Sequence, residues 1–143
     1  MAIFNKVNDF VEYAVEGINL GSDQLAVAFS NVAPTGEAND PTADNNGKLA
    51  NVTEIDYTNL SSRDLTTLAS GQTGGVYKLD LQDLTVTTSG GPTGPFRYVY
   101  LYNDTLADKP LIGWYDYGSS ITLNDGDSFT LDFSAVNGVI QIT

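Results

Sequence analysis

The chain contains no cysteine and no histidine. Without cysteine it has no disulfide, no thiol nucleophile and no cysteine-ligated metal site. Without histidine it lacks the commonest general base and the commonest metal ligand of proteins. A Ser-His-Asp type of catalytic site is therefore excluded. Only a serine–lysine pair, for which no motif is present, or paired carboxylates stay open as catalytic groups.

Basic residues are scarce as well. Six Lys and Arg stand against 18 Asp and Glu, which gives a formal net charge of −12 at pH 7. Such a charge repels nucleic acid and anionic membrane surfaces, so no nucleic acid and no membrane is expected as a partner. Neutral or basic protein surfaces are favoured instead.

Long apolar runs are absent too. No segment approaches the roughly 20 apolar residues that a membrane span requires. The N-terminal sequence MAIFNKVNDFVEY lacks the basic start and apolar centre of a signal peptide, so we expect synthesis in a cytoplasm and a soluble product. The length of 143 residues suits a single domain over 1–143.

The N-terminal segment shows a helical spacing. Apolar residues in 4–18 recur at steps of three and four: Phe4, Val7, Phe10, Val11, Ala14, Val15 and Ile18. This spacing predicts a helix with one buried stripe. An extended arm is the alternative, because Val, Phe and Tyr also favour strands. We therefore divide the chain into an N-terminal helix or arm over 1–20 and a β domain over 24–143.

A strand and a long loop follow. Leu25, Val27 and Phe29 alternate with small and polar residues, which predicts a half-buried strand. Residues 31–50 are rich in Pro, Gly, Asn, Asp and Thr and lose all periodicity, so they are predicted to form a long polar surface loop. Its length is typical of a mobile or binding loop.

The remainder of the chain is rich in strand signals. Asn51–Ile55 is a short strand candidate, and a weak helical turn is predicted near Asp64–Leu68. From Val76 onward, strand-like segments alternate with turn sequences; the segments are VYKLDLQDLTVTT, FRYVYLYND, PLIGWYDYG, SSITL, DSFTLDF and GVIQI, and the turns between them include SGGPTGP, NDTLADKP, YGSS and NDGD. This spacing predicts a mainly β fold, an antiparallel β-sandwich or barrel-like domain with a short N-terminal helix and a long polar loop.

One predicted strand carries aromatic rings at every second position, namely Phe96, Tyr98, Tyr100 and Tyr102. The other face carries Val99 and Leu101, and a strand that is apolar on both faces is typical of the centre of a covered sheet. The pattern favours a core role, with the tyrosine hydroxyls at the rim of the core. A sugar-stacking platform and a protein contact surface remain alternatives.

Acidic turns are the remaining candidate sites. Asn124, Asp125 and Asp127 supply oxygen ligands of the kind that Ca²⁺ prefers, but an Asp-Gly hairpin turn explains the same residues. Paired carboxylates of a glycoside hydrolase would need a separation that sequence does not give. We therefore assign no catalytic, cofactor-binding or metal-binding residue, and no cofactor.

Four motifs carry a resemblance to a known family: LGSD at 20–23, SNVAP at 30–34, PFRYVYLYND at 95–104 and LIGWYDYGSSITL at 111–123. Together with their surroundings they resemble small virion proteins of tailed bacteriophages, a family similar to capsid decoration, or cement, proteins. The resemblance covers nearly the whole chain. The chain departs from the family in a longer loop over 36–47.

The resemblance implies a non-enzymatic structural protein on the outer capsid surface of the virion, made in the cytoplasm of the bacterial host. Its implied partners are the major coat protein of the mature shell and further copies of itself, as a dimer or trimer. We expect residues 1–16 and the loop 31–50 to make these contacts, because a single core explains them least. Deletion of residues 1–12 is then expected to abolish particle binding and to spare the β domain.

Two other classes compete with this function. A tail or fibre-associated module would recognise host-surface carbohydrate through exposed aromatic residues such as Trp114, Tyr115 and Tyr117. A carboxylate-dependent hydrolase would act on cell-wall or capsular sugar and would lose activity on a single Asp→Asn change.

Overall fold

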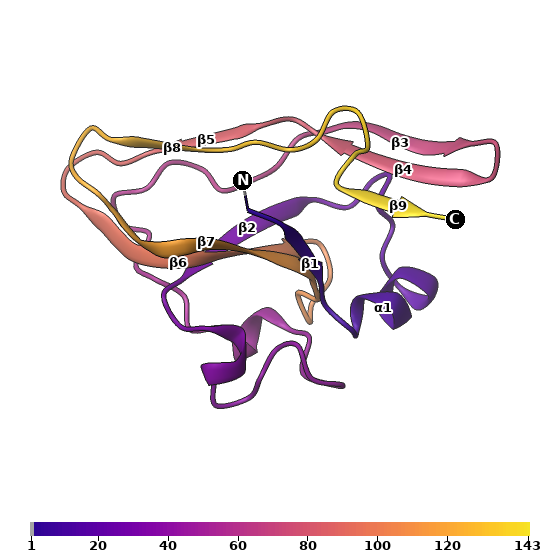
Figure 1. The fold of residues 1–143 in the computed structure, drawn as a ribbon, viewed down its shortest axis with the longest axis horizontal. Helices are drawn as coiled ribbons and strands as arrows, with labels where there is room; N and C mark the ends of the chain where they lie inside the picture. Colours follow the sequence, from indigo (N-terminus) through magenta and orange to yellow (C-terminus); the bar gives the residue numbers. More distant parts are fainter. Residues whose placement is uncertain (1) are drawn as a thin grey trace.

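The structure, a computed structural model, describes residues 2–143 and has two layers of antiparallel sheet (Figure 1). The first layer is a four-stranded sheet in the order β1-β7-β6-β2, whose bounds are β1 (Phe4–Lys6), β2 (Leu25–Ser30), β6 (Thr93–Asn103) and β7 (Leu111–Leu123). The second layer holds two smaller sheets, β3-β4-β9 and β5-β8, with bounds β3 (Thr67–Thr73), β4 (Val76–Leu81), β5 (Leu84–Thr87), β8 (Ser128–Leu131) and β9 (Ile140–Ile142). The predicted mainly β, sandwich-like fold is confirmed.

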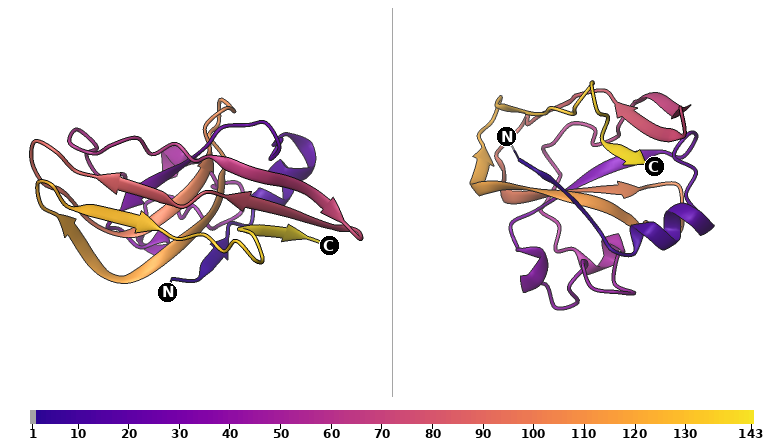
Figure 2. Two further views of the ribbon diagram at one scale, coloured as in Figure 1. Left: turned by 90° about the horizontal axis from the view of Figure 1, so that it is seen from above. Right: turned by 45° about the vertical axis from the view of Figure 1, so that its right-hand side comes forward.

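Three short helical elements complete the fold. They are the helix α1 (Phe10–Glu16) and the 3₁₀ turns η1 (Pro34–Gly36) and η2 (Leu49–Asn51). The 90° turn of Figure 2 (left) shows β4 lying between β3 and β9 in the second layer. The part of the chain that the structure describes contains no helix long and apolar enough to span a bilayer.

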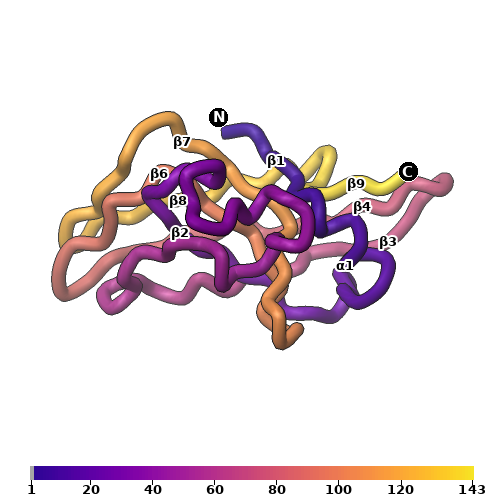
Figure 3. Tube along the Cα trace, turned by 90° about the horizontal axis from the view of Figure 1, so that it is seen from below, coloured from indigo at the N-terminus to yellow at the C-terminus, as the bar shows by residue number. Residues whose placement is uncertain are grey.

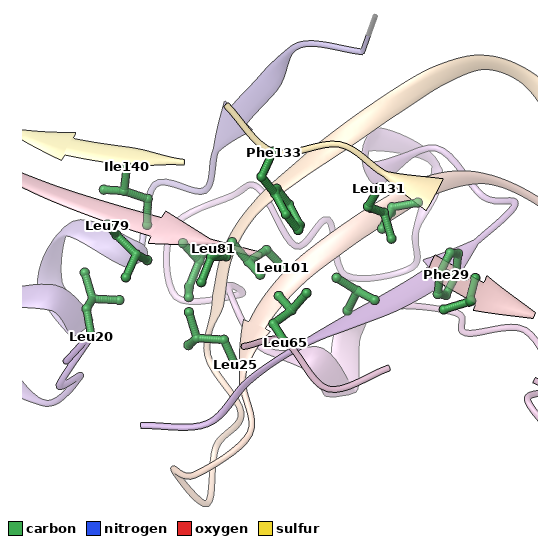
Figure 4. Close-up of a cluster of buried hydrophobic side chains, with 14 of the residues drawn as sticks. Leu20, Leu25, Phe29, Leu65, Leu79, Leu81, Leu101, Leu131, Phe133 and Ile140 are labelled. Carbon is green, nitrogen blue, oxygen red and sulfur yellow. The ribbon is translucent and has the colours of Figure 1, made fainter. Parts of the chain in front are cut away.

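The main core lies between the two layers (Figure 4). Side chains from β2 and β6 meet side chains from the second layer, and Phe29, Phe96 and Phe129 pack edge to face, with ring centroids 4.8 Å apart for Phe29 and Phe96. Such edge-to-face packing is favoured by the ring quadrupoles. Phe96 of β6 is thus a core residue, as the core interpretation predicts. The expectation that the tyrosine hydroxyls reach the rim of the core is wrong for Tyr100, whose hydroxyl is buried without a hydrogen-bond partner.

A second core lies on the opposite face of the four-stranded sheet. Tyr98, Tyr100 and Tyr102 point to this face, where they pack with Val52. Figure 3 shows the loop that covers this face, running across the sheet beside α1. We call residues 31–53 the covering loop. The strand β6 is therefore apolar on both faces because both faces are buried.

The four aromatic rings of β6 do not share one face. A register shift separates Phe96 from Tyr98 in the pairing of β6 with β7, so Phe96 joins the main core while the three tyrosines join the second core. Strict alternation predicts that all four rings lie on one face of the sheet. That prediction is wrong, because the register shift between Phe96 and Tyr98 is a β-bulge that turns the strand there.

The N-terminal prediction is right only in part. The predicted helix over 4–18 is a strand at Phe4–Lys6 and a helix only at Phe10–Glu16. Residues 4–6 pair with β7, and the backbone N–H of the fully buried Val7 donates to the carbonyl of Ile112 at 3.0 Å. The extended-arm alternative is thus correct for the first of the two segments.

Four further local predictions are wrong. The strand β2 is buried on both faces, rather than half-buried, because the covering loop lies over its second face. Residues 51–55 form no strand, and the segment around Asp64 bridges to Ala26 instead of forming a helical turn. The sequence YGSS is no turn, because β7 continues through it to Leu123.

The segment 55–65 has a structural role that its polar sequence does not indicate. It runs along the outer edge of β2, where Ile55 N–H donates to Phe29 carbonyl at 2.9 Å and Leu65 N–H donates to Leu25 carbonyl at 2.9 Å. The Arg63 guanidinium stacks on the Tyr57 ring at 3.8 Å. This edge of the sheet is therefore covered.

Candidate functional site

The helix α1 is held in place by the covering loop. The Asp9 carboxylate accepts the backbone N–H of Asn45 at 2.9 Å and that of Gly47 at 2.8 Å. A Cβ at Gly47 would lie 2.7 Å from the Cβ of Asp9, so glycine permits this close approach. The N-terminal segment and the loop 31–50, both expected to make contacts, lie side by side.

The outer side of α1 carries an exposed apolar pair. Val11 and Val15 are 51% and 82% exposed, whereas Phe10 on the other side of the helix is buried. Glu12 and Glu16 form a second exposed row next to the valines, since residues four apart share a helix face. We call these four residues, Val11, Glu12, Val15 and Glu16, the α1 surface. It combines an apolar centre with an acidic border.

A cleft borders the α1 surface. It has a volume of about 360 Å³, and its lining residues are Asp9, Glu12, Tyr13, Glu16, Gly17, Asn45, Lys48 and Leu106. The Tyr13 hydroxyl donates to the Asp108 carboxylate at 3.4 Å, and Lys48 lies 3.6 Å from the same carboxylate. Partial burial raises the pKa of Tyr13, so its hydroxyl stays protonated at neutral pH.

Both segments expected to make contacts also contribute to the two cores. The segment 1–16 was expected to be poorly explained by a core, but Val7 and Phe10 are core residues. The covering loop likewise packs Ala33, Leu49 and Val52 on the second core. Ile3, Val11 and Val15 remain exposed and apolar in these two segments. The helical spacing missed the α1 surface because it assigned Val11 and Val15 to the buried stripe.

The aromatic residues proposed for sugar binding do not form one platform. Trp114 packs on the second core, near Tyr98 at a ring distance of 6.2 Å, whereas Tyr115 and Tyr117 pack against the main core. A groove of about 570 Å³ is lined by Ala2, Tyr115, Asp116, Tyr117, Gly118, Thr130 and Asp132. Two of the three aromatic candidates are therefore brought together, and the third is not.

Asp116, one of the two acids of this groove, forms an ion pair with Arg97. Arg97 donates from Nε and Nη2 to the two oxygens of Asp116 at 2.8 and 3.0 Å. These bonds, together with the backbone N–H of Gly118, hold the pKa of Asp116 below its usual range. Asp116 is thus an ionised acceptor at neutral pH and a poor general acid.

The acidic turn at 124–127 uses its carboxylates within the chain. Asp127 accepts the backbone N–H of Asn124 at 2.9 Å, and Asp125 accepts that of Gly90 at 2.9 Å. The turn connects β7 of the first layer to β8 of the second, so the predicted hairpin is wrong because these two strands do not pair. Turn chemistry still explains the Asn, Asp and Gly residues. Among residues 2–143, no group of three Asp, Glu, His or Cys side chains is placed to hold a metal ion.

Two of the motifs that carry the family resemblance meet in a buried network. The Asn103 side chain is fully buried; it donates to the Asp23 carboxylate at 2.8 Å and accepts the N–H groups of Thr105 and Leu106 at 2.9 and 3.0 Å. Asp23 also accepts the N–H of Asn19 at 2.8 Å. These residues hold two loops together, so both motifs have a structural explanation.

A scan against protein-family models, a search of curated proteins and a search of solved structures found no match to this chain.

Proposed function

We propose that this chain is a non-enzymatic structural protein of a tailed-bacteriophage virion, a decoration or cement protein on the outside of the mature coat shell. The observation that supports the proposal is the α1 surface, an exposed valine pair bordered by glutamates on a helix tied to the covering loop. Exposed apolar groups with a polar border are typical of protein contact sites.

The chemistry of the α1 surface specifies the kind of coat surface that fits it. An apolar groove with a basic border would cover Val11 and Val15 and face Glu12 and Glu16. The hydrogen bonds that the covering loop donates to Asp9 hold the helix in place before binding, which lowers the entropy cost of association.

Stabilisation of the shell then follows from mass action. A protein that binds the mature lattice better than the immature one shifts the equilibrium toward the mature form, by an amount set by that difference in affinity. Each contact can be weak, because several linked copies raise the overall avidity without any new contact.

The double substitution Val11→Asp and Val15→Asp tests the α1 surface. Both positions are exposed, so the free energy of unfolding should change by no more than about 0.5 kcal/mol per site. Binding to phage particles that lack the protein should fall at least ~100-fold, because two carboxylates would be desolvated in an apolar contact. Co-sedimentation with the particles measures this loss.

A matched control exists at Val136, which is 83% exposed in the loop before β9. Val136→Asp adds one of the two charges, at a valine as exposed as Val15 but away from α1, and should leave co-sedimentation unchanged. Retained binding by the double variant, with an unchanged circular dichroism spectrum, would rule out the α1 surface as the contact.

Deletion of residues 1–12 does not test particle binding alone, although the sequence suggests that it would. The deletion would remove β1 and the two buried side chains Val7 and Phe10, so it would destabilise the β domain as well as remove contacts. The β domain is therefore not expected to stay intact after this deletion, and the point substitutions are the cleaner test.

An alternative is a tail or fibre-associated module that recognises host-surface carbohydrate. The groove lined by Tyr115, Tyr117 and Asp132 favours it, since tyrosine rings and acidic acceptors suit a sugar. Titration with purified host polysaccharide would show saturable binding that Tyr117→Ala abolishes. Absence of binding by the unaltered protein would remove this alternative.

A further inference from the structure

The strand β3 has one edge whose backbone groups are unpaired within residues 2–143. One edge of β3 pairs with β4, and no backbone hydrogen bond within residues 2–143 joins the other edge of Ala69–Thr73 to another segment. All side chains from Leu68 to Thr73 are exposed. The hairpin β3–β4 projects beside the body of the molecule in Figure 1.

The other sheet edges are covered, short or interrupted. The segment 55–65 covers β2, and Ser61 N–H donates to Thr87 carbonyl on β5 at 3.0 Å. The strands β1 and β9 have three residues each, and β8 has four. The outer part of β7 is broken by an irregular register around Gly118, whose φ is 84°. Such devices protect natural sheet edges from pairing.

The edge of β3 has little of this protection. Residues 65–77, LTTLASGQTGGVY, contain no charged residue and no proline, although the chain as a whole carries a net charge of −12. A register shift between Thr67 and Ala69 is the only irregularity of its pairing with β4, and pairing is regular from Ala69 to Thr73. The nearest charges on the hairpin, Lys78 and Asp80, neutralise each other at 3.2 Å.

This charge distribution identifies the partner. Two copies with a net charge of −12 each repel one another over most approaches, and the β3–β4 hairpin is a place where they meet without opposing acids. An antiparallel pair of identical strands is also self-complementary about a two-fold axis, as a closed dimer requires.

We propose that this chain forms a two-fold symmetric dimer through its β3 edges, with Ala69–Thr73 of one copy paired antiparallel to Ala69–Thr73 of the other. The two three-stranded sheets then form one continuous six-stranded sheet, in the order β9-β4-β3-β3-β4-β9. The inference rests on the strand edge alone and holds whether or not the chain binds a phage shell.

Gly71 is the position for the test. A Cβ at Gly71 would meet no atom within 4 Å, and its φ lies outside the left-handed region, so side chains fit there in the single copy. In the dimer, long side chains at this position reach those of the facing strand. Gly71→Lys and Gly71→Glu should each weaken dimerisation at least ~10-fold through like-charge contact, whereas the neutral Gly71→Gln should not.

Analytical ultracentrifugation of the full chain, over micromolar to millimolar concentrations, measures the dimer directly. The unaltered chain and Gly71→Gln should dimerise, and the Lys and Glu variants should each dimerise at least ~10-fold more weakly. An equimolar mixture of the Lys and Glu variants should recover a dimer, because opposite charges then face each other across the axis.

Three outcomes would overturn the inference. The unaltered chain could stay monomeric throughout, the charged variants could dimerise as well as the unaltered chain, or the mixture could stay monomeric. Ser119→Lys, at an exposed position on β7, is a control that should dimerise normally. The ultracentrifugation experiment does not involve phage particles, so a failure of the dimer inference is distinguishable from a failure of the proposed function.

Discussion

Replacement of Tyr100 by alanine is expected to lower the free energy of unfolding by about 3–5 kcal/mol, by analogy with buried Phe→Ala changes. Tyr100 is fully buried at the centre of the second core, between the four-stranded sheet and the covering loop. Removal of its ring leaves a cavity that the surrounding strands cannot close. Urea unfolding followed by circular dichroism measures the change.

The matched change Tyr100→Phe separates the ring from its hydroxyl. The hydroxyl is buried without a hydrogen-bond partner, and burial, with Glu37 and Asp40 nearby, raises the pKa of Tyr100. An unpaired buried hydroxyl costs about 1–3 kcal/mol of desolvation. Tyr100→Phe should therefore leave the protein as stable or more stable. A large loss in Tyr100→Phe, or almost none in Tyr100→Ala, would contradict the second core.

Gly113→Ala is expected to have the second large effect, because it acts on the pairing of β1 with β7. A Cβ at Gly113 would lie 2.2 Å from the Phe4 ring and 2.7 Å from the backbone carbonyl oxygen of Asn5. A flexible ring can turn away, but the backbone oxygen requires β1 itself to move. Overpacking of this kind costs about 1–3 kcal/mol.

The functional consequence of Gly113→Ala follows from the position of β1 just before α1. Displacement of β1 should move the α1 surface and reduce co-sedimentation with particles, while the strands of the second layer keep their amide protection in hydrogen exchange. Gly71→Ala, where the added methyl meets nothing, is the control and should retain particle binding. Full particle binding by Gly113→Ala, with lost protection in β1, would show that the arm does not position the contact.

The predictable part of the fold comes from local patterns. Alternating apolar residues between two turn sequences predict β6, and apolar residues on both faces predict its central place. The turns NDTLADKP and NDGD were predicted for the same reason, since Asn, Asp, Gly and Pro favour the backbone conformations of turns. These features depend on neighbours in the sequence.

The wrong predictions depend on contacts far along the chain. Residues 4–6 have a helix-compatible spacing, but Gly113 leaves room for them to pair with β7 as a strand. The bulge that separates Phe96 from Tyr98 arises in the pairing with β7, and alternation alone does not reveal it.

The candidate site was predictable only as a region. The N-terminal segment and the loop 31–50 were both expected to make contacts, and they do lie together, joined by Asp9. The exposed pair Val11 and Val15 was missed because helical spacing gives a stripe but not its direction. Burial of Phe10 and Val7 in the core decides which side of the segment faces solvent, and it leaves Val11 and Val15 on the exposed side.

The most direct test of the proposed function is the copy number of this chain in purified phage particles. Quantitative mass spectrometry against the major coat protein measures the ratio. The decoration proposal predicts a ratio within a few-fold of one to one. A few copies per particle would place the chain at the tail or at a single vertex and revive the carbohydrate alternative, and complete absence from the particle would contradict the proposal.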